Sequence, residues 1–103
     1  MKTLSLMTGL ALALASAGAW AGVDDAMNKA GCMACHSKDK KLVGPSFKEI
    51  AAKYKGQDVT ATLMQKVRTG GKGSFGPIPM APNPPEKIND ADLKEAVELI
   101  LKS

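Results

Sequence analysis

The two cysteines and the one histidine of this 103-residue chain stand together. Cys32 and Cys35 are separated by two residues, and His36 follows directly. This spacing lets both thiols reach the two vinyl groups of one porphyrin while the imidazole approaches the iron from below. The pattern therefore predicts one covalently bound haem c, with Cys32 and Cys35 as the attachment points and His36 as an iron ligand.

Other uses of the same motif are weaker interpretations. A thioredoxin-like dithiol expects strands in a βαβ setting, and no run of this chain alternates with the period of a strand. A zinc site needs four ligands, whereas the chain has only two cysteines and one histidine. A structural disulfide between Cys32 and Cys35 remains an alternative, because small secreted domains use disulfides.

Met80 is the best candidate for a second iron ligand. It lies in the proline-rich segment 76–85, and prolines fix φ, so that its side chain is presented from a stiff segment. A thioether is a weak, soft and neutral donor that stays on iron only where the protein holds it at little entropic cost. The chain between His36 and Met80 is also long enough to pass around a porphyrin. The other methionines after residue 21 are interpreted as core or motif residues: Met27, Met33 and Met64.

Two occupied axial positions indicate the class of function. With His36 and Met80 both on the iron there is no open coordination site, so the chain predicts a one-electron carrier without catalysis of its own. Thioether and imidazole ligation together also raise the reduction potential. The alternative function is a haem-based gas sensor, which would need Met80 to be easily displaced.

Residues 1–21 have the form of a signal peptide. Lys2 supplies the positive start, an apolar stretch follows, and Ala-Trp-Ala at 19–21 is an A-x-A cleavage signal. Cleavage after this tripeptide leaves one small domain, residues 22–103, for which an apolar core alone gives marginal stability. The alternative is an uncleaved membrane anchor, because no charged residue occurs between Lys2 and Asp24.

Helical spacing of apolar residues predicts an all-α domain of four to five short helices around the haem. Four segments are placed as helices: Val23 to the haem motif, with Asp24 and Asp25 in the first turn; Ser46, as an S-x-x-E cap, to Gly56; Asp58 to Gly70; and Asn89, with Asp92 in its cap, to the end. Their predicted inner faces are Val23, Met27 and Ala30; Phe47, Ile50, Ala51 and Tyr54; Val59, Leu63, Met64 and Val67; and Leu93, Ala96, Val97, Ile100 and Leu101. Residues 71–87 are too rich in Gly and Pro to be helix.

Together these features resemble a class I cytochrome c of the small bacterial c-551/c-552 (c8) family. The resemblance runs from about Val23 to Lys102. It rests on four segments in this order: GCMACH (31–36), LVGP (42–45), FKEIAAKYKGQ (47–57) and GPIPMAPN (76–83). The formal charge of +4 is too small to argue for nucleic acid as a partner.

The resemblance implies roles for further residues. The Pro45 carbonyl would accept a hydrogen bond from the second ring nitrogen of His36, which fixes the tautomer of a ligating histidine. Asn83 would hydrogen-bond near the sulfur of Met80, and Gly31 would lie where the first and last helices cross closely.

The resemblance also implies a monomeric carrier in the periplasm, without stable membrane insertion once the signal is removed. Its partners would be larger redox proteins such as respiratory complexes, terminal oxidases, nitrite reductases or dihaem peroxidases. Two residues depart from the family pattern. Phe75 stands where a Trp often donates to a haem propionate, and Lys66 stands where an Arg commonly binds that propionate with two hydrogen bonds.

Overall fold

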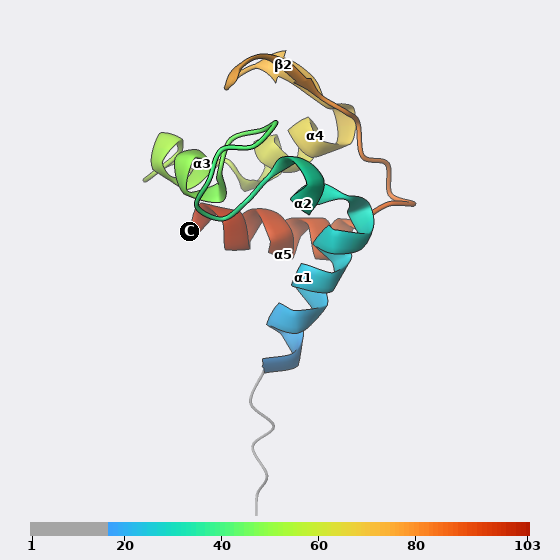
Figure 1. Ribbon diagram of the computed structural model, residues 1–103. Helices are drawn as coiled ribbons and strands as arrows, with labels where there is room; N and C mark the ends of the chain where they lie inside the picture. Colours follow the sequence, from blue (N-terminus) through green and yellow to red (C-terminus); the bar gives the residue numbers. More distant parts are fainter. Residues whose placement is uncertain (1–16) are drawn as a thin grey trace, which may run out of the picture.

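The computed structural model describes residues 17–103, which form five helices and one β-hairpin (Figure 1). In chain order they are α1 (Ala17–Ala30), α2 (Cys32–Cys35), α3 (Phe47–Lys53), α4 (Thr60–Thr69), β1 (Gly71–Gly73), β2 (Gly76–Met80) and α5 (Asp90–Leu101). Most of the predicted signal peptide, and with it the alternative membrane anchor, lies outside the described residues. Among residues 17–103, no helix has both the length and the apolar character needed to cross a bilayer.

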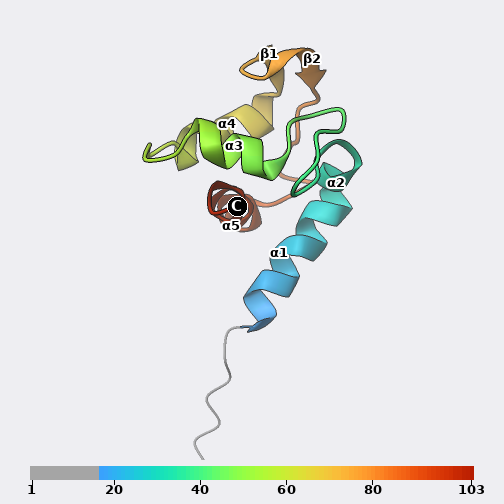
Figure 2. The same cartoon turned by 60° about the vertical axis from the view of Figure 1, so that its left-hand side comes forward.

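Helix α5 lies at the centre of the fold. Helices α1, α3 and α4 each pack against it, and Figures 1 and 2 show α3 and α4 above α5 with α1 crossing one end. The buried core consists of Ile88 and residues from three of the four predicted inner faces: Val23, Met27, Ala30, Phe47, Ile88, Leu93, Ala96 and Val97. The predicted face of α4 is only partly buried, and Leu63, Met64 and Val67 pack against this core. The all-α prediction is therefore confirmed, because these faces converge on one core.

The hairpin of β1 and β2 is the element that helical patterns did not predict. Its strands are antiparallel, with Gly73 opposite Gly76 and Gly71 opposite Met80. All of its residues up to Pro79 are exposed except those at the turn. Because neither face of the strands is buried, the sequence does not need to alternate apolar and polar residues there. Prolines are tolerated in β2 because a two-stranded hairpin has only edge strands.

Side chains at the helix starts fix where α3 and α5 begin. Ser46, which is 1% exposed, accepts a hydrogen bond through Oγ from the Glu49 N–H at 3.1 Å, as the S-x-x-E pattern predicts. Asn89 caps α5, since its Oδ1 accepts from the Asp92 N–H at 2.8 Å and its Nδ2 donates to the Asp92 carboxylate at 3.1 Å. The capped helices carry their apolar faces to the core from fixed starting points.

Two predictions about helix starts were wrong. Helix α4 begins after Val59, whose carbonyl accepts the first helical hydrogen bond, so Asp58 is not its first residue. Helix α1 begins at Ala17, which leaves Asp24 and Asp25 inside the helix and away from its first turn. In both cases the pattern of backbone hydrogen bonds sets the helix boundary. An acidic side chain near the start of a helix stabilises it but does not fix its first residue.

The expected role of Gly31 was also wrong. A Cβ atom at this position would meet no atom within 4 Å, so no close helix crossing requires glycine there. Gly31 instead has φ of +84° at the junction of α1 and α2. Glycine adopts this left-handed conformation without steric cost, and the chain can therefore turn directly from α1 into the haem motif.

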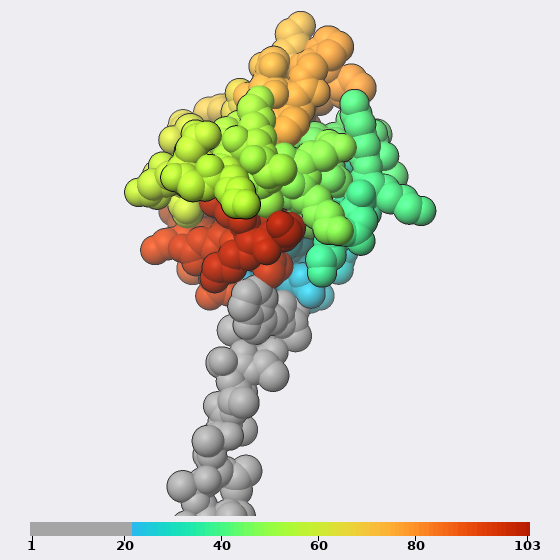
Figure 3. Space-filling model, turned by 90° about the vertical axis from the view of Figure 1, so that its left-hand side faces the viewer, coloured from blue at the N-terminus to red at the C-terminus, as the bar shows by residue number. Residues whose placement is uncertain are grey.

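Figure 3 shows the face on which α3 covers the middle of the molecule. Helix α5 lies beneath α3 and the hairpin lies above it. Helix α3 and the hairpin are joined here by Lys53, whose Nζ donates to the Ser74 carbonyl. The hairpin is thus held over the helical layer.

Candidate functional site

The helices and the hairpin enclose a cavity of about 320 Å³ with mainly apolar walls. Its apolar wall includes Met27, Phe47, Ile50, Leu63, Val67, Ile78, Leu93, Ala96, Val97 and Ile100. Five of the six candidate site residues also line it: Cys32, Cys35, His36, Pro45 and Met80. Asn83 lies outside the lining. A cavity of this size and polarity is typical of a cofactor site.

The imidazole of His36 is held in one orientation. Its Nδ1 lies 2.7 Å from the Pro45 carbonyl oxygen, which can only accept, so Nδ1 carries the proton. The ring also stacks on Phe47, with centroids 5.8 Å apart and planes 25° apart. In the neutral imidazole this arrangement leaves the lone pair on the remaining ring nitrogen, Nε2, which is the atom that can bind a metal.

Gly44 makes this orientation possible, and its individual role was not predicted. A Cβ atom on Gly44 would lie 2.6 Å from Cε1 and 3.0 Å from Nδ1 of His36. The Gly44 N–H also donates to the Cys35 carbonyl at 2.8 Å, which folds the loop back onto the motif. The only signal in the sequence was the place of Gly44 within the LVGP segment.

The two cysteines lie on the single turn of α2 and neither forms a disulfide. Cys32 is half-buried and Cys35 is exposed. Burial raises the pKa of the Cys32 thiol; Cys35 adds to this effect, while a backbone hydrogen bond and Lys87 oppose it. Both cysteines belong to the cavity lining, so one planar ligand in the cavity lies within the reach of both.

Met80 is the last residue of β2 and is half-buried at the cavity. The backbone around it lies against Gly70 at the end of α4. A Cβ atom on Gly70 would overlap the Met80 carbonyl oxygen and come within 2.8 Å of the Pro82 nitrogen. Gly70 also has φ of +68° and ψ of −159°, a region that is essentially restricted to glycine. The sequence predicted Gly70 only as the end of a helix.

Asn83 connects the segment after Met80 to α4. It is 8% exposed, and its backbone N–H donates to the Val67 carbonyl at 2.9 Å. Its side-chain Nδ2 donates to the Ala81 carbonyl at 3.0 Å. These bonds fix the turn that immediately follows Met80.

The two residues that depart from the family pattern, Lys66 and Phe75, both line the cavity. The Phe75 ring meets the Tyr54 ring edge to face at 6.3 Å. The Lys53 Nζ lies 4.5 Å from the centroid of Phe75, within the range of a cation–π contact. Two lysines, Lys66 and Lys72, belong to the cavity lining and give it positive charge, which suits a carboxylate.

Comparison with known proteins identifies the family. Residues 24–103 match the family model for Cytochrome c. The chain is a member of the cytochrome c family. It is 53% identical over 76 residues to cytochrome c2 of Rubrivivax gelatinosus, covering 73% of this chain and 89% of that protein. It is 44% identical over 102 residues to cytochrome c-552 of Nitrosomonas europaea, covering 98% and 97%.

The solved structures agree with this assignment. The crystal structure of wild-type Nitrosomonas europaea cytochrome c552 superposes with a TM-score of 0.68 and 41% identity, covering 77% of this chain and 96% of that one. The resemblance to the c-551/c-552 family is thereby confirmed. The cofactor of this cytochrome is a single c-type haem and its activity is electron transfer.

The site fits a c-type haem by its own chemistry. Two unpaired thiols on one helical turn supply the attachment atoms, and the apolar walls suit a porphyrin. An imidazole with a free Nε2 and a thioether line the same cavity. These are the donor types found in cytochromes c with Met/His ligation.

Proposed function

We propose that the cytochrome is a periplasmic one-electron carrier whose haem iron is bound by His36 Nε2 and Met80 Sδ. When bound, the haem supplies an Fe(III)/Fe(II) couple. The main support is that His36 and Met80 line one cavity while the Pro45 carbonyl fixes the His36 tautomer. With both axial positions taken by the protein, no place remains for a substrate, so the proposal includes no catalysis.

The other candidate residues have supporting roles in this proposal. Cys32 and Cys35 would supply the sulfur atoms of the two thioether bonds to the haem. Pro45 holds the imidazole proton on Nδ1, which keeps Nε2 as the donor atom. Asn83 fixes the turn after Met80 and so limits where the thioether can move.

We place the partner surface at the mouth of the cavity. Val43 and Ile78, which belong to the cavity lining, are 52% and 57% exposed. Lys66 and Lys72 also line the cavity. Apolar side chains beside lysines suit brief docking of a monomeric carrier onto larger redox proteins that present acidic groups, because opposite charges speed association.

The visible spectrum of the purified protein tests this function. We expect a low-spin haem with thioether linkages and, in the oxidised state, the charge-transfer band of a thioether on iron. We also expect slow or absent binding of carbon monoxide to the reduced protein at neutral pH, because Met80 would occupy the iron coordination site that carbon monoxide needs. Rapid binding would favour the gas sensor, and a colourless protein would favour the disulfide-stabilised alternative.

The mass of the protein isolated from both the periplasmic and the membrane fractions of the producing cells tests the predicted signal peptide. Cleavage after residue 21 gives a chain that begins at Gly22. A haem-containing chain that still begins at Met1 and fractionates with membranes would instead support the tethered carrier. The two products differ by the whole of residues 1–21, so intact mass spectrometry separates them clearly.

A further inference from the structure

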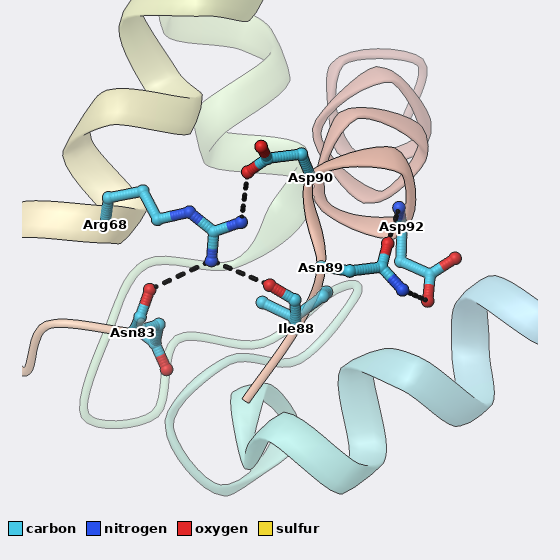
Figure 4. A network of polar contacts seen from close by, with 6 residues as sticks. All are labelled: Arg68, Asn83, Ile88, Asn89, Asp90 and Asp92. Atoms are coloured by element: carbon cyan, nitrogen blue, oxygen red, sulfur yellow. Dashed lines mark hydrogen bonds and ion pairs between the residues drawn. The ribbon is translucent and has the colours of Figure 1, made fainter. Parts of the chain in front are cut away.

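The side chain of Arg68 joins three points of the segment that follows Met80 (Figure 4). Its Nη1 donates to the Asn83 carbonyl at 3.1 Å and to the Ile88 carbonyl at 2.7 Å. Its Nη2 lies 2.6 Å from the Asp90 carboxylate. The Arg68 side chain is only 16% exposed, so water competes little for its two bonds to backbone carbonyls, whereas the Asp90 carboxylate is 82% exposed.

Arg68 acts together with its neighbours in the last turn of α4. The carbonyl of Val67 accepts the Asn83 N–H, while Arg68 donates to the Asn83 carbonyl, so both backbone groups of Asn83 are held. Gly70 lies directly against the backbone at Met80 and Pro82. The end of α4 thus contacts the chain on both sides of the turn after Met80.

The same helix forms part of the cavity wall. Leu63 and Val67 line the cavity, and Val67 is next to Arg68 in the chain. The position of the segment 81–89 is therefore fixed relative to the cavity and not only to the rest of the loop. The Met80 side chain, which lines the cavity, is therefore held in place by the same contacts.

The contacts of Arg68 depend on the shape of its guanidinium. Two of its nitrogens serve two carbonyls and one carboxylate from a planar, fixed fork, which the single ammonium of a lysine cannot reproduce. Asn83 and Ile88 are 8% and 4% exposed, so their carbonyls have little access to water as a replacement partner. Loss of Arg68 should therefore loosen the segment.

We propose that Arg68 is a positioning residue for the iron ligand Met80, an inference that rests on the proposed function. A thioether binds iron weakly, and its occupancy depends on how little entropy it loses on binding. By holding Asn83, Ile88 and Asp90 to α4, Arg68 keeps Met80 at the iron and external ligands out. The oxidised protein is the more sensitive state, because a thioether prefers Fe(II).

Imidazole binding to the oxidised holoprotein tests this proposal, since imidazole can bind only when Met80 leaves. We expect Arg68→Leu to bind imidazole about tenfold more tightly than the parent protein, which corresponds to about 1.4 kcal/mol. Arg68→Lys should bind imidazole less tightly than Arg68→Leu but more tightly than both the parent protein and Asp90→Asn, because a lysine keeps the charge but cannot reproduce the fork of contacts. Asp90→Asn should change affinity less than about threefold, since this carboxylate is 82% exposed.

Val23→Ala is the matched control for general destabilisation. Val23 is 4% exposed in the core but does not line the cavity. It should lower the denaturation midpoint while leaving imidazole affinity unchanged. The proposal is overturned if Arg68→Leu binds imidazole like the parent, or if Val23→Ala raises affinity equally.

The failure of the proposed ligation would look different. In that case the oxidised parent protein itself would lack the thioether charge-transfer band, and imidazole would bind tightly before any substitution. If Arg68→Leu does not yield holoprotein, the imidazole affinities of Arg68→Lys and Asp90→Asn are compared to test the proposal. Equal imidazole affinities for these two variants would then overturn the role of the guanidinium fork.

Discussion

Met80→Ala keeps the haem attached, opens one axial position and lowers the reduction potential. The thioethers at Cys32 and Cys35 do not involve Met80, so the variant should still be isolated as holoprotein. Loss of the thioether removes a ligand that stabilises Fe(II). Axial ligands shift haem potentials over a range of about 0.8 V, so a fall on the order of 0.1 V is expected. A spectroscopic redox titration measures it.

Met64→Ala is the matched control for this substitution. Met64 is half-buried on α4 and packs against the core, but it does not line the cavity. Its loss should reduce stability while the potential and the oxidised spectrum stay as in the parent protein. If Met80→Ala retained the parent spectrum and potential, another group would be the second ligand.

Most of what could be predicted about the site came from the spacing of residues that are close together in the sequence. Cys32, Cys35 and His36 are neighbours in the chain, so their chemistry can be recognised before anything is known of the fold. The apolar faces of α3 and α5 were predicted for the same reason, because helical periodicity is a local property. Met80 needed one further step, the stiffness of its proline-rich segment.

The residues that were missed depend on contacts between distant parts of the chain. Gly70 is required because the backbone near Met80 passes against it, and nothing in its own neighbourhood indicates that approach. Arg68 resembles an exposed cation in a last helical turn until its acceptors at Asn83 and Ile88 are seen. For Gly31 the error was the opposite one. A close contact between helices was expected there, whereas the positive φ of the local turn is what favours glycine.

The hairpin escaped prediction for a related reason. Alternation of apolar and polar residues appears in a strand only when one of its faces is buried. In β2 the exposed faces of residues 76–79 leave no such constraint, and the glycines of both strands have positive φ. The segment could therefore be recognised as non-helical from its composition, while its pairing could not.

His36→Ala has the largest expected effect, the loss of folded holoprotein. The substitution removes the iron donor, the hydrogen bond to Pro45 and the ring that stacks on Phe47. Without haem, the cavity of about 320 Å³ stays unfilled. The cavity opens to solvent at Val43 and Ile78, so its apolar walls would then lie against water. The apolar burial lost in this way is a large part of what stabilises a small domain, whose whole stability is about 5–15 kcal/mol.

Haem content per polypeptide and thermal unfolding of the purified variants measure this effect. Lys41→Ala is the matched control, because Lys41 lies in the same loop, is exposed and pairs with His36 only through the backbone. It should yield holoprotein like the parent. A folded, low-spin holoprotein obtained from His36→Ala in normal yield would mean that the cavity is filled and the iron bound without this imidazole, which contradicts the proposed ligand set.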